Sequence, residues 1–310
     1  MKIIHVEDMH CDAGWRDFSF LKITTDDGTV GWCEYLEGQY AGGNGGALSS
    51  ELRFFGEYII ERGYDPMAHE VIVHDLRSLS IQVAGGIAAQ AIACIENCCL
   101  DIKGKVLGVP VSTLLGGAMR DRLPVYWSHC GNARVHHHEL VGSAPLRNLD
   151  DVRALGAEVA AKGLKGLKCN LFHGSGFGDF PGYAASRSRK QAQQSLRDDY
   201  GRNCPDALVN QIVAQMQAFR EGAGPDMQLR LDTNYSFKTE GYIKVAKALD
   251  ASGVNMDWLE LDNYEPRALG RIRAESPVPI ASLESLYGRK AFYPFLEASA
   301  VDVAIIDATW

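Results

Sequence analysis

Hydrophobic and polar positions alternate with a period of two near the start of the chain. The alternation runs through residues 18–25 (FSFLKITT) and resumes over residues 29–34, after a short Asp-Asp-Gly segment at 26–28. Two alternating runs joined by an Asp-Gly turn are typical of a β-hairpin. Helical spacing of apolar residues follows over 49–62 and 86–107. Together these elements predict an α+β unit.

The pattern changes at Leu123, where strand-like and helix-like runs begin to alternate. The strand-like runs are residues 124–128, 166–170, 228–232, 258–262, 279–284 and 301–307. The helix-like runs between them include residues 150–162, 207–221, 239–252 and 287–298. This alternation predicts parallel strands joined by crossover helices, and therefore an α/β fold. We place the domain boundary between an α+β domain at 1–122 and an α/β domain at 123–310.

Composition narrows the class of protein. The net charge of −8 argues against binding to nucleic acids or to anionic membrane surfaces. No apolar run reaches the roughly 18 residues that a membrane-spanning helix needs. Glu7 and Asp8 interrupt the segment where a signal peptide would be apolar, so we expect a cytoplasmic protein. The eight cysteines form no CxxC pair, and we expect them to be reduced and mostly buried.

Three polar segments are candidates for loops. His136-His137-His138 could bind a metal, but its position favours a solvated loop. The glycine-rich residues 38–46 predict a mobile loop, and no Lys-Ser/Thr follows them as in a phosphate-binding loop. The Gly-, Ser- and Arg-rich residues 172–205 form a long insertion, which predicts a functional lid or a disordered segment.

Acidic residues end four successive predicted strands. Asp232, Glu260, Glu284 and Asp307 are separated by 28, 24 and 23 residues, each close to one βα unit of a barrel. The carboxyl ends of barrel strands converge on one mouth, where three carboxylates repel one another unless a cation lies between them. Three oxygen ligands suit Mg²⁺. We therefore predict a metal site at the first three; each acid could alternatively be a helix N-cap or a polar strand end.

Lys168 supplies a positive charge beside these acids. The period of two places Lys168 and Asn170 on one face of their strand and Lys165 on another. Lys168 could pair with a substrate carboxylate, or it could act as an acid or base. Alternatively, Lys168 extends to the surface, as we expect for Lys165.

Several segments together resemble the enolase superfamily, and within it the mandelate racemase and muconate lactonizing enzyme family. These are TTDDGTVGWCEY, LDIKGKVLGVPVSTLLGG, and the series LDTN, WLELDN and ASLES. The resemblance implies a capping domain whose specificity loops correspond to residues 14–20 and 38–46, followed by a modified (β/α) TIM barrel. Its enzymes use a Lys or His base with Mg²⁺ to stabilise an enediolate.

The resemblance also implies roles for individual residues. Asp232, Glu260 and Glu284 match the three Mg²⁺ ligands. Asn234 matches the Asn of an Asp-x-Asn motif. Lys168 matches the first Lys of a Lys-x-Lys pair, which binds the substrate carboxylate, and Asp307 matches the Asp that orients a catalytic His.

Three departures from the family pattern affect these expectations. Asn170 replaces the second Lys and cannot carry a proton at neutral pH. Leu261-Asp262 replaces a Glu-Pro pair. The chain stops at Trp310, after a sixth barrel strand, and its barrel part is shorter than the roughly 250 residues of a full barrel. We therefore expect a barrel lacking its last strands, with the catalytic His beyond the end of this chain.

The leading functional hypothesis is dehydration of an acid sugar, because one His–Asp pair suffices to eliminate water whereas a two-base racemase needs a proton carrier on each face. Racemisation, epimerisation or cycloisomerisation within the same family is the alternative. A Schiff-base aldolase using Lys168 and an inactive homologue that binds sugar acids are further possibilities. The expected partners are a small carboxylate substrate and further copies of the chain, without nucleic acid or membrane.

Overall fold

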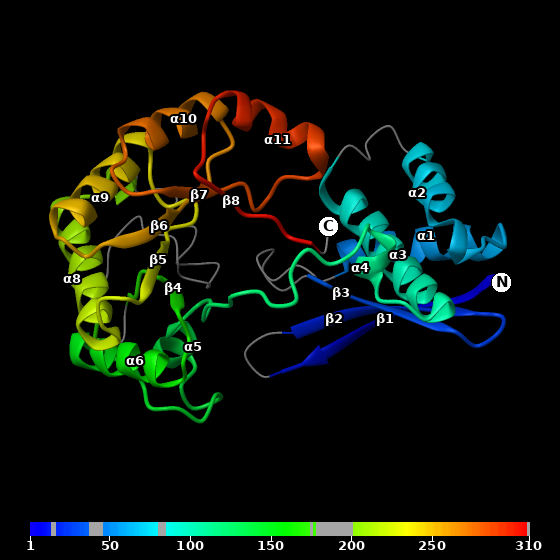
Figure 1. Cartoon of the computed structure of the whole chain (residues 1–310), viewed down its shortest axis with the longest axis horizontal. Helices are drawn as coiled ribbons and strands as arrows, with labels where there is room; N and C mark the ends of the chain where they lie inside the picture. The colour runs from blue at the N-terminus through cyan, green and yellow to red at the C-terminus, as the bar shows by residue number, and fades with distance from the viewer. Residues whose placement is uncertain (14–16, 37–45, 80–84, 174–175, 178–200, 309–310) are drawn as a thin grey trace. The chain divides into compact units, whose positions relative to one another are not determined.

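The structure is a computed structural model that describes residues 1–13, 17–36, 46–79, 85–173, 176–177 and 201–308. The chain forms two compact units, shown in Figure 1. The N-terminal unit comprises Met1–Arg122 with Leu286–Gly288 and Asp307–Trp310, and the α/β unit comprises Leu123–Ser285 with Arg289–Ile306.

The sheet of the N-terminal unit is antiparallel, with strand order β1-β2-β3. Its strands are β1 (Ile3–Asp12), β2 (Asp17–Thr25) and β3 (Val30–Tyr35). Thr25 and Thr29 close the β2–β3 turn through a backbone hydrogen bond of 3.0 Å, and Gly28 takes a φ of 84° that favours glycine. The predicted hairpin is therefore confirmed.

Helices accompany this sheet; the first and third contact its strands, and the second and fourth pack against the third. They are α1 (Ala47–Glu61), α2 (His69–Ser78), α3 (Gly86–Leu107) and α4 (Val111–Leu114), with a 3-10 turn at Pro66–Ala68. A side chain at Gly31 of β3 would come within 2.2 Å of the carbonyl oxygen of Cys98 in α3, so glycine permits this close packing. All eight cysteines are free thiols, and seven of them are buried, as expected from the sequence.

The sheet of the α/β unit is parallel, with strand order β4-β5-β6-β7-β8. Its strands are β4 (Gly166–Asn170), β5 (Gln228–Asp232), β6 (Met256–Glu260), β7 (Ile280–Ser282) and β8 (Val303–Ala304). Its helices are α5 (Asn132–His136), α6 (Leu149–Ala161), α8 (Asp206–Ala223), α9 (Thr239–Ala251), α10 (Pro266–Glu275) and α11 (Gly288–Glu297), with a 3-10 turn at Gly201–Asn203. In Figure 1 the strands follow a curve, and helices α6, α8, α9 and α10 lie on its outer side. The predicted alternation of strands and helices is confirmed.

Three local predictions need correction. Residues 124–128 contribute one parallel bridge, between Trp127 and Leu167, instead of a full strand. The predicted strand at 301–307 is reduced to β8. Both are edge segments that pair with one neighbouring strand within the described residues, and pairing on one side supports only a short ladder. His136 ends the short helix α5, although the sequence favoured a loop there.

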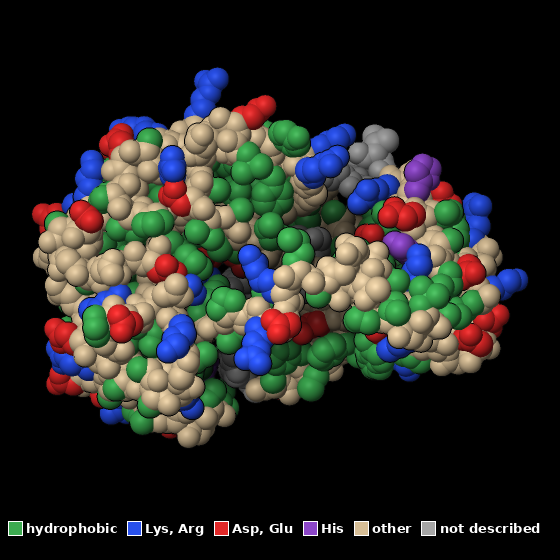
Figure 2. All heavy atoms as spheres, viewed as in Figure 1, with side chains coloured by type: hydrophobic (Ala, Val, Ile, Leu, Met, Phe, Trp, Pro, Cys, Tyr) green, Lys and Arg blue, Asp and Glu red, His purple; other side chains and the backbone are tan. Residues whose placement is uncertain are grey.

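Two further observations concern membrane-spanning helices and the distribution of charge on the surface. Within the described residues, no helix is long and apolar enough to cross a membrane. Acidic and basic side chains are interspersed over the face drawn in Figure 2, instead of gathering into one basic area.

Candidate functional site

Three parallel strands end side by side, each on a polar residue. The strand register pairs Asn170 with Asp232 and Asp232 with Glu260. Two residues earlier, the same register pairs Lys168 with Arg230. Because side chains two residues apart lie on one face of a strand, Lys168 is on the same face as Asn170, in the row below the strand-end residues.

Lys168 forms a buried ion pair with the predicted metal ligands. Its Nζ lies 2.9 Å from both Oε1 and Oε2 of Glu260 and 3.7 Å from Oδ2 of Asp232. All three side chains are buried, with 8%, 3% and 9% of the side chain exposed for Lys168, Glu260 and Asp232. Burial lowers the pKa of Lys168, but the charges of Glu260 and Asp232 outweigh burial and raise the pKa above its usual value. The two acids therefore favour the charged form of Lys168.

The carboxylates repel one another in spite of this lysine. Burial raises the pKa of Glu260 to about 6, with further contributions from the charges of Asp232 and Glu284. Burial and the same two neighbours, together with Glu260, raise the pKa of Asp262 to about 7. Four carboxyl groups therefore interact around one ammonium group, and this excess of negative charge favours binding of a cation.

Asparagine side chains and backbone groups hold the strand ends in place. Asn170 accepts a 2.6 Å hydrogen bond from Nδ2 of Asn132 and donates one of 3.1 Å to the carbonyl oxygen of Asp232. The backbone N–H of Asn234 donates to Oδ1 of Asp232 at 2.9 Å, which orients that carboxylate. The carbonyl oxygen of Asn234 in turn accepts a 2.7 Å bond from the hydroxyl of Tyr242.

Glu284 follows β7 on a strained piece of backbone. The preceding residue, Leu283, has a φ of 89° although it is not glycine, and its side chain is buried. A left-handed conformation costs a non-glycine residue about 1 kcal/mol or more, and such positions cluster at functional sites. Glu284 itself is exposed, but it lies close enough to Glu260 and Asp262 to raise the pKa of both.

The chemistry of these donors fits a hard divalent cation, because the groups at the strand ends are carboxylate oxygens with excess negative charge. The ligand atoms of Asp232, Glu260 and Glu284 do not all lie within 4.8 Å of one another, and Nζ of Lys168 contacts the first two residues. Within the described residues, the one trio of ligand-type side chains whose atoms all lie within 4.8 Å of one another is elsewhere: His69, Glu70 and Glu96 of the N-terminal unit. Sequence analysis missed this trio, which no motif signals because its members lie on two helices.

The other predicted features lie outside the strand-end cluster. Asp307 follows β8 and groups with the N-terminal unit instead of the α/β unit. The predicted specificity loops at 14–20 and 38–46 fall largely outside the described residues, as does most of the insertion at 172–205. Of that insertion, His173 is described, and its ring lies 5.1 Å from that of His136.

Asp262 is a member of the cluster to which sequence analysis assigned no role. It lies two residues beyond Glu260, and its backbone N–H donates to the carbonyl oxygen of Asn234 at 3.1 Å. This bond ties the loop after β6 to the loop after β5. The sequence did contain a signal for this role of Asp262, because an acid occupies the segment where the family pattern has Glu-Pro.

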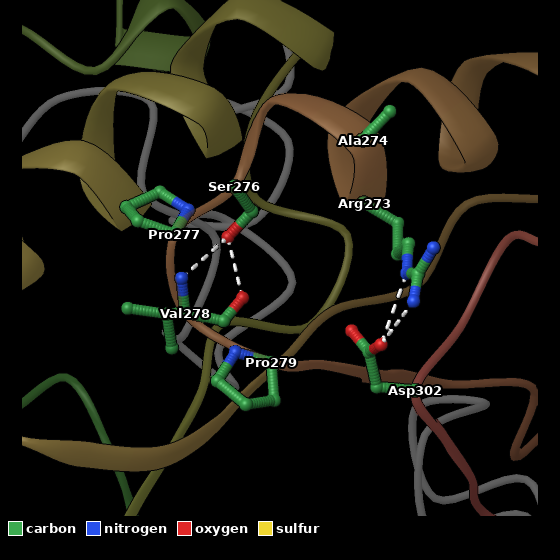
Figure 3. A pocket seen from close by; sticks show the side chains of 7 residues that line it. All are labelled: Arg273, Ala274, Ser276, Pro277, Val278, Pro279 and Asp302. Carbon is green, nitrogen blue, oxygen red and sulfur yellow. Dashed lines mark hydrogen bonds and ion pairs between the residues drawn. The ribbon is translucent and has the colours of Figure 1, made fainter.

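The opposite ends of the strands carry a small hollow, drawn in Figure 3, with a volume of about 330 Å³. Arg273 at the end of α10 donates to Oδ1 of Asp302, and Oδ2 of Asp302 accepts the backbone N–H of Ile280 at 2.9 Å. These charged groups satisfy each other. The pair of Arg273 and Asp302 beside the hollow therefore helps to hold β7 in place.

Comparison with known families decides the relationship. Residues 151–310 match the family described as enolase C-terminal domain-like, and residues 13–116 match the mandelate racemase / muconate lactonizing enzyme N-terminal domain. The chain belongs to the enolase superfamily. It is a member of the mandelate racemase and muconate lactonizing enzyme family, and the predicted resemblance and α/β TIM-barrel fold class are confirmed.

Relatives within the superfamily have several activities. The chain is 29% identical over 297 residues to D-galactarolactone cycloisomerase of Agrobacterium fabrum, covering 93% of this chain and 63% of the relative. It is 34% identical over 176 residues to D-galactonate dehydratase of Variovorax paradoxus, covering 52% of this chain and 43% of the relative. The chain therefore spans less than two-thirds of the length of these relatives.

A solved superfamily structure from Burkholderia xenovorans is also similar. It is titled as a candidate L-alanine-DL-glutamate epimerase bound to magnesium and fumarate, and it is 36% identical to this chain with a TM-score of 0.86. The match covers 100% of this chain and 73% of the solved chain. Magnesium and a dicarboxylate thus occur together in a related structure.

Proposed function

We propose that the protein is a Mg²⁺-dependent lyase that removes water from a sugar acid, acting through an enolate of the substrate carboxylate. The observation that carries this proposal is the cluster of buried carboxylates around Lys168 at the strand ends of an enolase-superfamily member. The names of the relatives support the substrate class, since one is a D-galactonate dehydratase.

In this proposal Asp232, Glu260 and Glu284 hold Mg²⁺. When bound, the ion supplies positive charge that lowers the cost of ionising the substrate next to its carboxylate. The ammonium of Lys168 pairs with a carboxylate oxygen of the substrate. Its raised pKa supports this role because it favours the charged form of the group.

Asn170 and Asn234 bind substrate without moving protons. The amide of Asn170 already makes bonds to Asn132 and to the backbone of Asp232, so it is held rigidly beside the cluster. A side-chain amide cannot act as an acid or a base at neutral pH. This favours a reaction in which protons are transferred on one face of the substrate. Asp307 orients a His base in this scheme.

Cycloisomerisation of a sugar-acid lactone is the second candidate, because the relative that matches over 93% of this chain is a D-galactarolactone cycloisomerase. Both reactions begin by removing a proton next to a carboxyl group. They differ in the product, since a dehydratase releases water and a cycloisomerase conserves the mass of its substrate.

The test is a screen of aldonates, aldarates and their lactones with Mg²⁺ or with a chelator, followed by mass spectrometry. The proposal expects loss of one water from at least one aldonate or aldarate, abolished by the chelator. An isomer of unchanged mass would favour the second candidate. Turnover that persists in chelator, with borohydride trapping at Lys168, would instead indicate an aldolase, and binding without turnover an inactive homologue.

We further propose a cytoplasmic homo-oligomer that binds neither nucleic acid nor membrane. The net charge of −8 supports the absence of nucleic-acid and anionic-membrane binding, since it disfavours binding to polyanions. Analytical ultracentrifugation of the protein would test the assembly, and a monomer at micromolar concentration would contradict it.

A further inference from the structure

Three side-chain hydroxyls meet beside the carboxylate cluster. Tyr235, Tyr264 and Ser285 lie in the loops after β5, β6 and β7, each a few residues beyond one of the proposed metal ligands. The hydroxyl of Tyr235 hydrogen-bonds to that of Tyr264, and it lies 2.8 Å from Oγ of Ser285. The two phenol rings stack with centroids 5.3 Å apart and an interplanar angle of 25°.

This hydroxyl cluster of Tyr235, Tyr264 and Ser285 is close to the acids. Tyr235 and Tyr264 come three and four residues after Asp232 and Glu260, and Ser285 directly follows Glu284. The charge of Asp262, which lies in the same loop as Tyr264, also acts on Tyr235. The hydroxyl cluster therefore adjoins the proposed catalytic carboxylates at the carboxyl ends of the strands.

The two tyrosine side chains are exposed, although they stack on each other and share a hydrogen bond. Tyr235 has 45% and Tyr264 has 66% of its surface exposed. Each hydroxyl has one donor proton and two acceptor lone pairs. Two hydrogen bonds among three hydroxyls consume two donors, which leaves one donor and several lone pairs for a ligand. The stacked rings add a flat apolar surface suited to the C–H face of a carbon chain.

We propose that Tyr235, Tyr264 and Ser285 form a subsite that binds the hydroxyl groups of the substrate, beyond its carboxylate, and so selects polyhydroxylated acids. This inference rests on the proposed function, because it needs a carboxylate held at the adjacent acids and Lys168. An acid without hydroxyl groups uses the carboxylate site alone and does not depend on the hydroxyl cluster.

The experiment compares two kinds of ligand by isothermal titration calorimetry in saturating Mg²⁺. The probes are a panel of C5 and C6 aldonates that includes D-galactonate, and fumarate, which has carboxylates and no hydroxyl. The variants are Tyr264→Phe and Tyr235→Phe, each of which removes one oxygen and keeps the ring. Tyr293→Phe, an exposed tyrosine of α11, is the matched control.

The inference expects Tyr264→Phe and Tyr235→Phe each to weaken the tightest-binding aldonate by about three- to tenfold, the usual effect of one hydrogen bond. Fumarate affinity should stay within about twofold of the wild type, and Tyr293→Phe should change neither. Equal weakening of both ligands, or no change in either, would overturn the subsite. Wild-type protein that binds fumarate but no aldonate would also overturn it, while leaving the carboxylate site intact. Binding of neither acid would overturn the proposed function itself.

Discussion

The two ends of the parallel strands in the α/β unit differ in how their charged side chains are balanced. At the carboxyl ends, Asp232, Glu260, Asp262 and Glu284 interact around the single ammonium of Lys168, and two of these acids have raised pKa values. Negative charge is in excess there. The backbone is also strained, at Leu283.

Toward the amino ends, two arginines have their charges matched by protein groups. Arg230, in the middle of β5, donates to Oδ2 of Asp257 near the start of β6 at 2.7 Å and stacks between Tyr126 and Trp258, at 4.3 and 3.9 Å from the ring centroids. Arg220 donates to five backbone carbonyls: those of Val254, Gly224, Pro225, Met227 and Asn255. The difference teaches that the amino ends stabilise the fold, while the carboxyl ends keep unbalanced charge that a ligand can use.

The sharpest test of the carboxyl end is Glu260→Gln. We expect it to abolish Mg²⁺-dependent turnover, a loss of at least about 1,000-fold or 4 kcal/mol, because it removes a charged metal donor. Steady-state assays and Mg²⁺ titration calorimetry would measure this, with circular dichroism to confirm folding. Glu275→Gln, on an exposed part of α10, is the control and should behave as wild type. Retained Mg²⁺ affinity in Glu260→Gln would contradict the ligand assignment.

The amino end is tested by Arg230→Met. We expect it to lower the free energy of unfolding by about 3 kcal/mol, because the partly buried ion pair with Asp257 is broken and the stacking is lost. Urea denaturation would measure this change. Mg²⁺ affinity should remain within about twofold of the wild type; a large loss of affinity would show that the two ends are not separate in function. Arg271→Met, at an exposed position, is the matched control.

Lys168→Met tests the pairing at the carboxyl end. Without Mg²⁺ we expect a loss of about 2 kcal/mol in the free energy of unfolding, less than for Arg230→Met because Glu260 can take up a proton when its partner is removed. Saturating Mg²⁺ should stabilise this variant more than it stabilises the wild type, since the ion replaces the missing positive charge. Thermal denaturation with and without Mg²⁺ would show this. The exposed Lys165→Met should show neither effect.

The smallest effect is a difference in pH dependence between the two ends. The pKa of Glu260 is raised from 4.5 to about 6 and that of Asp262 from 3.8 to about 7, so the folded state binds more protons than the unfolded state in this range. Their contribution to stability is therefore greatest below about pH 4 and is lost as the pH rises to about 7. Asp302 behaves oppositely: burial acts to raise its pKa, but bonds from Arg273 and the Ile280 N–H hold it below the usual value. Its contribution is lost as the pH falls through that lowered pKa.

Denaturation in chelator between pH 5 and pH 8 would measure this difference. Asp262→Asn should flatten the decline in stability, and Asp302→Asn should leave the decline unchanged. An unchanged slope in Asp262→Asn would show that this carboxyl group is not protonated in the folded state over that range.

Much of the fold could be predicted from the sequence, because local chemistry specifies it. The β2–β3 hairpin follows from alternation around an Asp-Gly turn, and β4, β5, α8 and α9 lie within one or two residues of the predicted bounds. The edge segments at 124–128 and 301–307 were overestimated. Strand length at an edge depends on neighbouring strands, which the segment's own residues do not encode.

The sequence by itself determined the family and the series of acids at or just after the strand ends, because a repeat of one βα unit is enough to align Asp232, Glu260 and Glu284. Tertiary structure alone decided that Lys168 pairs with Glu260, that Asp262 joins the cluster, and that Tyr235, Tyr264 and Ser285 meet. These contacts link residues that are 28 or more positions apart or depend on how a loop turns after its strand. Their distances and shared burial are set by packing between strands, and no periodicity along the chain reports them.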